Sequence, residues 1–303
     1  MADKRGTLAV DDERGALDAL LKKKPKYILV IWREFKRNKT ALAGAVVVVV
    51  LLALAFGAGF ITPFSAATAQ DVRARFTAPG PGHMFGTDYL GRDMFARILH
   101  GARVSLTMGI IPSACSLLFG MIFGGAAVYL GGKAETVIMR VCDVFSCIPG
   151  VLLALAFVAA LGPGLTNVMI AVTVAGIPDL TRYVRSVILN IVGLEYVDAA
   201  RACGVSGLMI VVRHVMPNAA GPLILPLVSN ISGMIMIGAG LSYLGLGVQP
   251  PNPEWGAMLA EGQNYFIRAP YLMIVPGIAI FVSVLAFNLM GDGLRDALDP
   301  KLR

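Results

Sequence analysis

The sequence predicts an all-α membrane protein with six transmembrane helices. Of its 303 residues, 56% are hydrophobic and 15% are charged, against about 45 to 50% apolar and about 25% charged residues in soluble domains. Long charge-free runs are the second observation, because a helix needs roughly 20 apolar residues to cross a bilayer. Glycine is abundant but follows no G-X-Y period, which excludes collagen-like chains, and the apolar content excludes disordered ones.

The spans follow from these runs. Four clear runs lie within residues 40–70, 104–130, 214–253 and 269–291. Two weaker candidates lie between them, interrupted by Pro149 and by Pro178 with Asp179, and a Gly-Pro-Gly turn joins them. This pair could equally form a shallow re-entrant hairpin, and either choice leaves the downstream orientation unchanged. We expect spans at about 40–62, 104–130, 137–161, 165–183, 219–247 and 269–290.

The basic residues predict the orientation. Eleven of the 26 Lys and Arg residues lie in residues 1–40. Placing this segment in the cytoplasm puts 20 of the 26 on the cytoplasmic side, as the positive-inside rule requires. The first apolar run starts too late and is too long for a cleavable signal peptide. We therefore expect a cytoplasmic segment over 1–39, a transmembrane domain over 40–303 and two cytoplasmic termini. The net charge of +7 indicates orientation and not a nucleic-acid partner.

Two external segments follow from this topology, at about 62–103 and 248–269. In the first, Phe95, Ile98 and Leu99 share a helical face opposite Arg92, which predicts a short amphipathic helix in the membrane interface. The second opens with a proline-rich run that ends at Trp255. This run predicts a stiff extended segment with its aromatic ring in the headgroup layer, or a docking surface for an external partner.

The second span carries a G-x-x-x-G pattern at Gly120 and Gly124. Two glycines four residues apart form a smooth helical face that another helix can approach closely. We expect this face to be a packing surface, and the pattern does not identify the partner helix.

Neither metal ligands nor catalytic residues are predicted. The four cysteines form no C-x-x-C pair, and the three histidines have no metal-binding spacing. No acid, base and nucleophile combine in a recognisable pattern. Residues 131–134 resemble the end of a phosphate-binding loop, but the upstream glycine and the Ser or Thr of such a loop are missing. We expect no catalytic site, no metal and no cofactor on this chain.

The most informative segment lies in the predicted cytoplasmic loop 184–218, at residues 195–217, here called the elbow. Residues 195–202 predict a short helix with acids at its N-terminus, and Gly204 is placed to end it in the left-handed conformation. A second helix is then expected to run to Pro217. Such a rigid corner fits a groove on another protein and transmits motion. An ordinary amphipathic connector on the membrane surface explains the spacing equally well.

The elbow resembles the coupling motif of ATP-binding-cassette importer permeases. The resemblance rests on Asp198-Ala199-Ala200, Gly204, His214 and Met216-Pro217, where Asp198 replaces the more usual Glu and Met216 the more usual Leu. Further motifs are similar to the dipeptide, oligopeptide and nickel subfamily, above all to the second permease subunit of dipeptide, oligopeptide and glutathione importers. They occur at 85–93, 101–106, 244–251, 253–256 and 286–296, and the resemblance spans about residues 28–303.

The resemblance implies the function of a non-catalytic permease subunit in the bacterial cytoplasmic membrane. The expected partners are a homologous second permease subunit, two ATP-binding-cassette ATPases that bind ATP and Mg, an extracytoplasmic solute-binding protein, membrane lipid and a peptide substrate. The chain would form half of the translocation pathway and work by alternating access. The residues implied to contact the ATPases are Glu195, Asp198, Ala199, Ala200, Arg201, Gly204, His214 and Pro217. No substrate-binding residue is assigned, and dipeptide, oligopeptide, glutathione and nickel all remain open as cargo.

A stand-alone, ion-coupled secondary transporter is the alternative function. Such proteins need ionisable residues buried at mid-membrane. The sequence offers two acids as candidates. We expect Asp143 to pair with Arg140 at a helix end, and Asp179 to lie near the cytoplasmic boundary. Neither acid is predicted to be an ion site.

Overall fold

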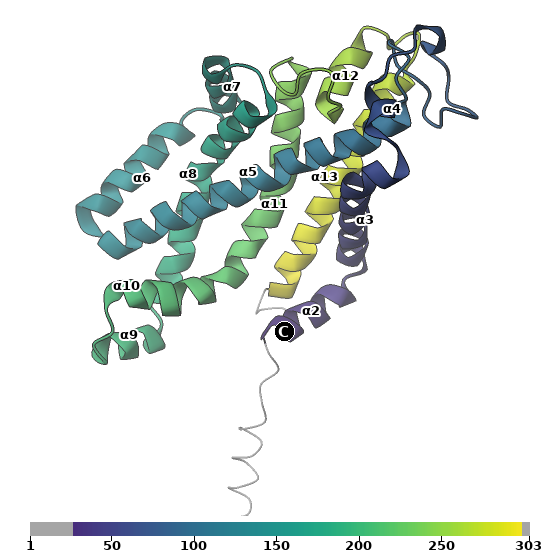
Figure 1. The fold of residues 1–303 in the computed structure, drawn as a ribbon. Coiled ribbons are helices and arrows are strands. Elements are labelled where there is room, and N and C mark those ends of the chain that lie inside the picture. The colour runs from purple at the N-terminus through teal and green to yellow at the C-terminus, as the bar shows by residue number, and fades with distance from the viewer. Residues whose placement is uncertain (1–26, 299–303) are drawn as a thin grey trace, which may run out of the picture.

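The computed structural model describes residues 27–298, and these confirm the all-α prediction. Figure 1 shows the arrangement of the helices. The α-helices are α2 (Tyr27–Arg37), α3 (Lys39–Ile61), α4 (Phe64–Thr68), α5 (Met94–Leu130), α6 (Gly132–Ser146), α7 (Gly150–Leu161), α8 (Leu165–Val192), α9 (Glu195–Ala202), α10 (Gly207–Met209), α11 (Met216–Tyr243), α12 (Trp255–Gln263) and α13 (Tyr271–Leu298). A 3-10 turn, η1 (Val72–Ala74), and a π-helical segment, η2 (Ile210–Val215), complete them.

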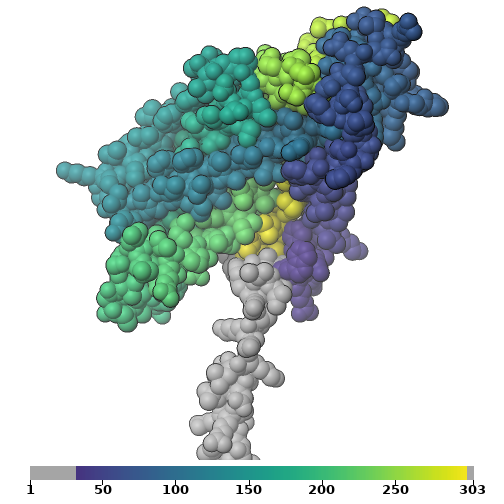
Figure 2. Space-filling model, in the orientation of Figure 1, coloured from purple at the N-terminus to yellow at the C-terminus, as the bar shows by residue number. Residues whose placement is uncertain are grey.

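The helix bundle is layered. Helix α5 crosses diagonally over α8, α11 and α13 and packs against all three (Figure 1). Helix α3 packs on α13 and α5, and α6 and α7 pack on α8. Residues 62–93 and α12 lie at one end, here called the loop end, and α9 and α10 lie at the other, here called the elbow end (Figure 1). In the space-filling view, α9 and α10 project at the lower left of the molecule (Figure 2).

The predicted G-x-x-x-G face packs against α8. A Cβ atom on Gly120 would lie 3.0 Å from the backbone carbon of Leu180, and one on Gly124 would lie 2.8 Å from the carbonyl oxygen of Thr181. Any side chain at these two positions would therefore push the helices apart. The packing prediction is confirmed, and the partner helix is α8.

Four helical segments among the described residues are long and apolar enough to cross a membrane: α3, α5, the continuous stretch Gly207–Tyr243 and α13. The α6–α7 pair raises this number to five if it forms one bent crossing. Helix α8 is 28 residues long, but it carries Asp179, Arg182 and Arg185, which lower its hydropathy. By length and composition alone, the described residues thus provide fewer crossings than the six predicted.

The third span, predicted at 137–161, is not one straight helix. Helices α6 and α7 meet at 87°, because the proline ring of Pro149 cannot continue α6 and instead starts α7 as its N-cap. The turn after α7 lies at the loop end, where the N–H of Gly164 donates to the carbonyl oxygen of Leu246 over 3.2 Å. Since α6 begins beside the opposite end of α5, this contact favours a full crossing over the re-entrant hairpin.

The prediction of a separate amphipathic helix at 92–99 is wrong. Helix α5 begins at Met94, capped by the Asp93 carboxylate, and runs on to Leu130 without a break. Gly101 does not interrupt it, because this position lies against Trp255 of α12. Trp255 itself is 1% exposed and its indole N–H donates to the carbonyl oxygen of Ile98 over 3.1 Å. The predicted headgroup position of this aromatic ring is therefore wrong as well.

Candidate functional site

The elbow has the predicted sharp glycine corner. Gly204 has a φ of +79°, the left-handed conformation that glycine adopts without a steric penalty. The N–H of Val205 donates to the carbonyl oxygen of Ala200 over 3.2 Å, and the N–H of Gly204 donates to that of Arg201 over 2.9 Å. These two bonds form a Schellman motif, which satisfies the last carbonyls of α9 and fixes its exit direction.

The elbow is anchored to the membrane helices. Val197 of α9 has no exposed surface, and it belongs to a core cluster with Ile191 of α8, Val215 of η2 and Leu223 of α11. Burying one valine side chain contributes roughly 1.5 to 3 kcal/mol. A Cβ atom on Gly207 would lie 3.1 Å from the ring of Tyr129, at the end of α5. The elbow therefore contacts α5, α8 and α11 at once.

The second helix of the elbow was predicted to end at Pro217, but it continues beyond this residue. Residues 207–243 form one continuous helical stretch through α10, η2 and α11. In a regular α-helix the ring of Pro217 would clash with the carbonyl of Arg213. The wider π-helical turn at 210–215 accommodates the proline. Because α8 also continues to Val192, most of the predicted loop 184–218 is helical.

The predicted contact residues fall into two groups. Glu195, Asp198, Ala199, Ala200, Arg201 and Gly204 lie on α9 and its corner, and His214 and Pro217 lie on η2 and the first turn of α11. Ala200 and His214 are half-buried and the other six are exposed. The Asn218 side chain connects the two groups, because its amide donates to the Tyr196 hydroxyl over 3.2 Å and to the His214 carbonyl over 2.6 Å.

The outer surface of the elbow carries small, charged and apolar side chains. The guanidinium of Arg201 pairs with Asp198 over 3.0 Å, and both side chains are more than half exposed. Ala199 and Ala202 lie exposed beside them. Leu208, Met209 and Val212 add apolar side chains that are 59%, 48% and 60% exposed. Exposed apolar groups within a polar rim are typical of a protein contact surface.

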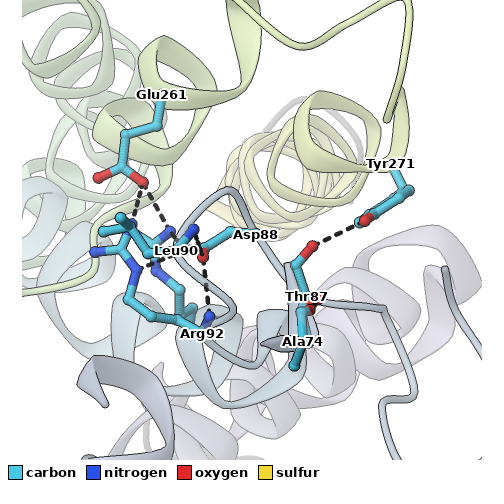
Figure 3. A network of polar contacts seen from close by, with 8 residues as sticks. Ala74, Thr87, Asp88, Leu90, Arg92, Glu261 and Tyr271 are labelled. Carbon is cyan, nitrogen blue, oxygen red and sulfur yellow. Dashed lines mark hydrogen bonds and ion pairs between the residues drawn. The ribbon is translucent and has the colours of Figure 1, made fainter. Parts of the chain in front are cut away.

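A buried ion network at the loop end was missed from the sequence. The Asp88 carboxylate accepts from Arg92 over 2.6 Å and from Arg97 over 2.5 Å, and Glu261 of α12 accepts from the same two arginines over 2.8 and 2.7 Å (Figure 3). Both arginines are 2% exposed. Burial lowers the pKa of Arg92, but Glu261 and Asp88 outweigh it and raise the pKa overall. The sequence signal for this network was the pair of arginines at the start of an apolar helix, because buried arginines need acidic partners.

Glu254 joins α12 to α5 at the same end. Its carboxylate accepts from the N–H groups of Gly256 and Ala257 over 2.9 and 2.8 Å and from the Ser105 hydroxyl of α5 over 3.0 Å. The side chain is completely buried. Burial raises the pKa of this carboxyl, while its hydrogen bonds act in the opposite direction.

Asp179 lies within helix α8, which continues past it to Val192. Its position near the cytoplasmic boundary of the span stays a prediction. Its carboxylate is 3.3 Å from the guanidinium of Arg182, which also lies 3.5 Å from Asp143. The predicted pair of Asp143 with Arg140 is present at 3.8 Å.

A groove of about 340 Å³ runs along α8, α11 and α13 beside Asp179. Its lining residues are Gly176, Asp179, Leu180, Tyr183, Leu225, Pro226, Ser229, Asn230 and Arg295. None of the polar residues among them was predicted to belong to a site, although Ser229 and Asn230 stand out within an otherwise apolar run.

Two family models match the chain. The family described as "Binding-protein-dependent transport system inner membrane component" matches residues 116–303. The "N-terminal TM domain of oligopeptide transport permease C" matches residues 27–79. The matches together cover the elbow, the groove and the first long helix.

Curated relatives and solved structures agree with these matches. The glutathione transport system permease protein GsiD of Pectobacterium atrosepticum is 44% identical over 272 residues, covering 90% of each chain. GsiD of an Escherichia coli strain is 41% identical, covering 96% of this chain and 97% of the relative. Two crystal forms of the inward-facing MetNI methionine ABC transporter share the fold, at a TM-score of 0.56 and 18% identity over 68% of this chain and 98% of theirs.

Proposed function

This chain belongs to the family of binding-protein-dependent transport system inner membrane components, and from that premise we propose that its elbow transmits the movement of partner ATPases to the membrane helices. The chain is the permease subunit of an ATP-binding-cassette importer, a non-catalytic membrane component whose ATPase is a separate chain. The alternative of a stand-alone secondary transporter is therefore wrong.

The observation that carries the proposal is the rigidity of the elbow. A Schellman motif fixes the exit from α9 at Gly204, and burial of Val197 fixes α9 on α8 and α11. A force applied to the exposed residues of α9 then moves the ends of these helices and does not dissipate in a loop. The contact residues on this surface are Glu195, Asp198, Ala199, Ala200, Arg201, Gly204, His214 and Pro217.

The orientation follows from the distribution of charge. The elbow end is cytoplasmic, because 20 of the 26 basic residues then lie on the cytoplasmic side. Both termini are cytoplasmic, and α6–α7 and α8 complete six crossings. The loop end faces outward, where the ion network and Glu254 hold α12 and residues 85–97 in one rigid surface for a solute-binding protein. The other partners are a homologous second permease and two ATPases, which bind ATP and Mg.

The cargo is a small peptide, with glutathione as the first candidate. The relatives at 41 to 44% identity are named as glutathione transport permeases. A peptide with a free ammonium group and free carboxylates also suits a pathway that carries acidic and basic side chains, as the groove does.

Reconstitution with the partner subunits tests this function. Binding protein loaded with glutathione, alanyl-alanine or Ni²⁺ is added to proteoliposomes, and ATP hydrolysis and uptake are measured. We expect glutathione to stimulate both, with no loss of uptake when ion gradients are collapsed. Stimulation by Ni²⁺ alone, or uptake that stops with the ion gradient, would contradict the proposal.

A further inference from the structure

Asp179 places an exposed charge on α8, one turn before Arg182, which lies on the cytoplasmic side in the proposed topology. Its side chain is 81% exposed, and its carboxylate is 3.3 Å from the guanidinium of Arg182. Because an exposed ionisable group faces water or another protein and not lipid, this face of α8 is not a lipid surface. It lies toward the cytoplasmic end of the proposed crossing.

The groove beside Asp179 is formed by α8, α11 and α13. Helix α5 packs across α8, α11 and α13 (Figure 1), yet none of the groove's lining residues belongs to α5 in the described chain. The groove borders the α5–α8 contact, where Gly176 and Leu180 pack against α5, and opens beside it toward α11 and α13. Polar side chains of all three helices line it, including Tyr183, Asn230 and Arg295.

Opposite charges lie on the two sides of this groove. Helix α11 packs against both α8 and α13, so Asp179 of α8 and Arg295 of α13 flank it. Arg182 is shared between Asp179 and Asp143, and Arg140 also pairs with Asp143. Asp179, whose side chain is 81% exposed, remains open to a further partner. Within the described part of the chain, Arg295 forms no ion pair and Asn230 forms no side-chain hydrogen bond.

We propose that this groove is a transit site for the peptide, in which Asp179 binds the α-ammonium group and Arg295 with Asn230 binds a carboxylate. The inference rests on the proposed function. A zwitterionic peptide complements the charges on the two sides of α11, and its charged ends would exchange water for charge-assisted hydrogen bonds. Peptide binding would therefore be weak and reversible, as passage along a pathway requires.

The test uses the complete transporter, with the second permease, both ATPases and the binding protein, in proteoliposomes. Asp179→Asn removes the charge and keeps the size of the side chain. We expect its uptake of glutathione and of alanyl-alanine to fall about tenfold or more, the range for losing a hydrogen bond to a charged group. ATP hydrolysis stimulated by loaded binding protein should stay within twofold of the wild type, and Asp179→Glu should restore part of the uptake.

Asp143→Asn is the matched control, because Asp143 also pairs with Arg182 but does not line the groove. We expect it to keep uptake within twofold. Arg295→Gln should lower uptake like Asp179→Asn, whereas Arg140→Gln, 80% exposed and outside the groove, should not.

Each other outcome overturns the inference in a distinct way. Normal uptake by Asp179→Asn, or an equal loss in Asp143→Asn, would contradict peptide binding while leaving the proposed function intact. Failure of Asp179→Asn to copurify with the second permease would assign Asp179 to subunit assembly instead. A wild-type transporter that imports neither peptide would contradict the proposed function itself.

Discussion

Arg97 at the start of α5 donates a hydrogen bond to Glu261 of α12 over 2.7 Å, although 164 residues separate them in the sequence. The same carboxylate accepts from Arg92, and Asp88 completes the network. Two acids and two arginines thus neutralise each other in an almost fully buried cluster. This cluster connects residues 88–97 to α12 and makes the loop end one rigid body.

Glu261→Gln should destabilise the protein. It leaves two buried arginines with only one acid. Removing one partner of a buried ion pair lowers the free energy of unfolding by about 3 to 5 kcal/mol. Because Glu261 is 18% exposed, we expect a loss of about 2 to 4 kcal/mol here. Thermal unfolding in detergent measures the effect. Glu34→Gln breaks the exposed pair with Arg37 and is the control, with an expected change below about 1 kcal/mol. Equal melting temperatures for both variants would contradict the account.

Glu254 should make stability depend on pH. Burial raises the pKa of its carboxyl in the folded state, so the unfolded chain releases this proton first as the pH rises above the ordinary value. Between the ordinary pKa and the raised pKa, the folded state therefore binds more protons than the unfolded chain. Stability is highest below the ordinary pKa and falls as the pH rises through the folded pKa. Glu254→Gln should lessen this dependence, and melting curves from pH 4 to 8 measure it. The same pH slope in both proteins would show that Glu254 is not its source.

Gly124→Ala should separate α5 from α8. The added Cβ would lie 2.8 Å from the carbonyl oxygen of Thr181, and overpacking of this kind costs roughly 1 to 3 kcal/mol. The control is Gly233→Ala on α11, where a Cβ meets nothing within 4 Å. We expect a lower melting temperature for the first variant and an unchanged or slightly higher one for the second. The reverse order would mean that this face does not hold the two helices together.

Ala199→Arg should weaken binding of the ATPase subunits without unfolding the permease. Ala199 is exposed on α9, so the larger side chain fits the permease but not a closely fitting partner. The control is Ser65→Arg, exposed on α4 at the opposite end. Copurification of the ATPases in detergent measures the effect. Full recovery of the ATPases with Ala199→Arg would place the contact elsewhere.

Local sequence rules predicted the features that depend on nearby residues. The left-handed conformation of Gly204 follows from its position after a short helix, and the close approach at Gly120 and Gly124 follows from their spacing. Pro149 marked a weakness in the third span, but the angle of the bend depends on packing against α8.

Features that depend on distant partners were not predicted. Arg92 was expected on an exposed helix face and Trp255 in the headgroup layer. Both are buried instead, against partners that lie 169 and 157 residues away in the sequence. The predicted span 165–183 belongs to a longer helix, because α8 continues through Arg182 and Arg185 to Val192. The groove was missed because no single helix carries enough of its polar residues to form a motif.

Uptake by Gly204→Val tests the central claim most directly, with Gly193→Val as its control. Valine at Gly204 would be strained, since φ there is +79° and the left-handed region costs about 1 to 2 kcal/mol. No atom lies within 4 Å of the added Cβ, so crowding is not the cause. Gly193, next to the elbow, has a φ of −81° that valine accepts.

In the reconstituted transporter we expect Gly204→Val to insert normally, to retain ATP hydrolysis and to lose more than nine-tenths of its uptake, in line with a strained corner that no longer transmits motion. Gly193→Val should keep at least half of the wild-type uptake. Wild-type uptake by Gly204→Val would contradict the coupling role of the elbow.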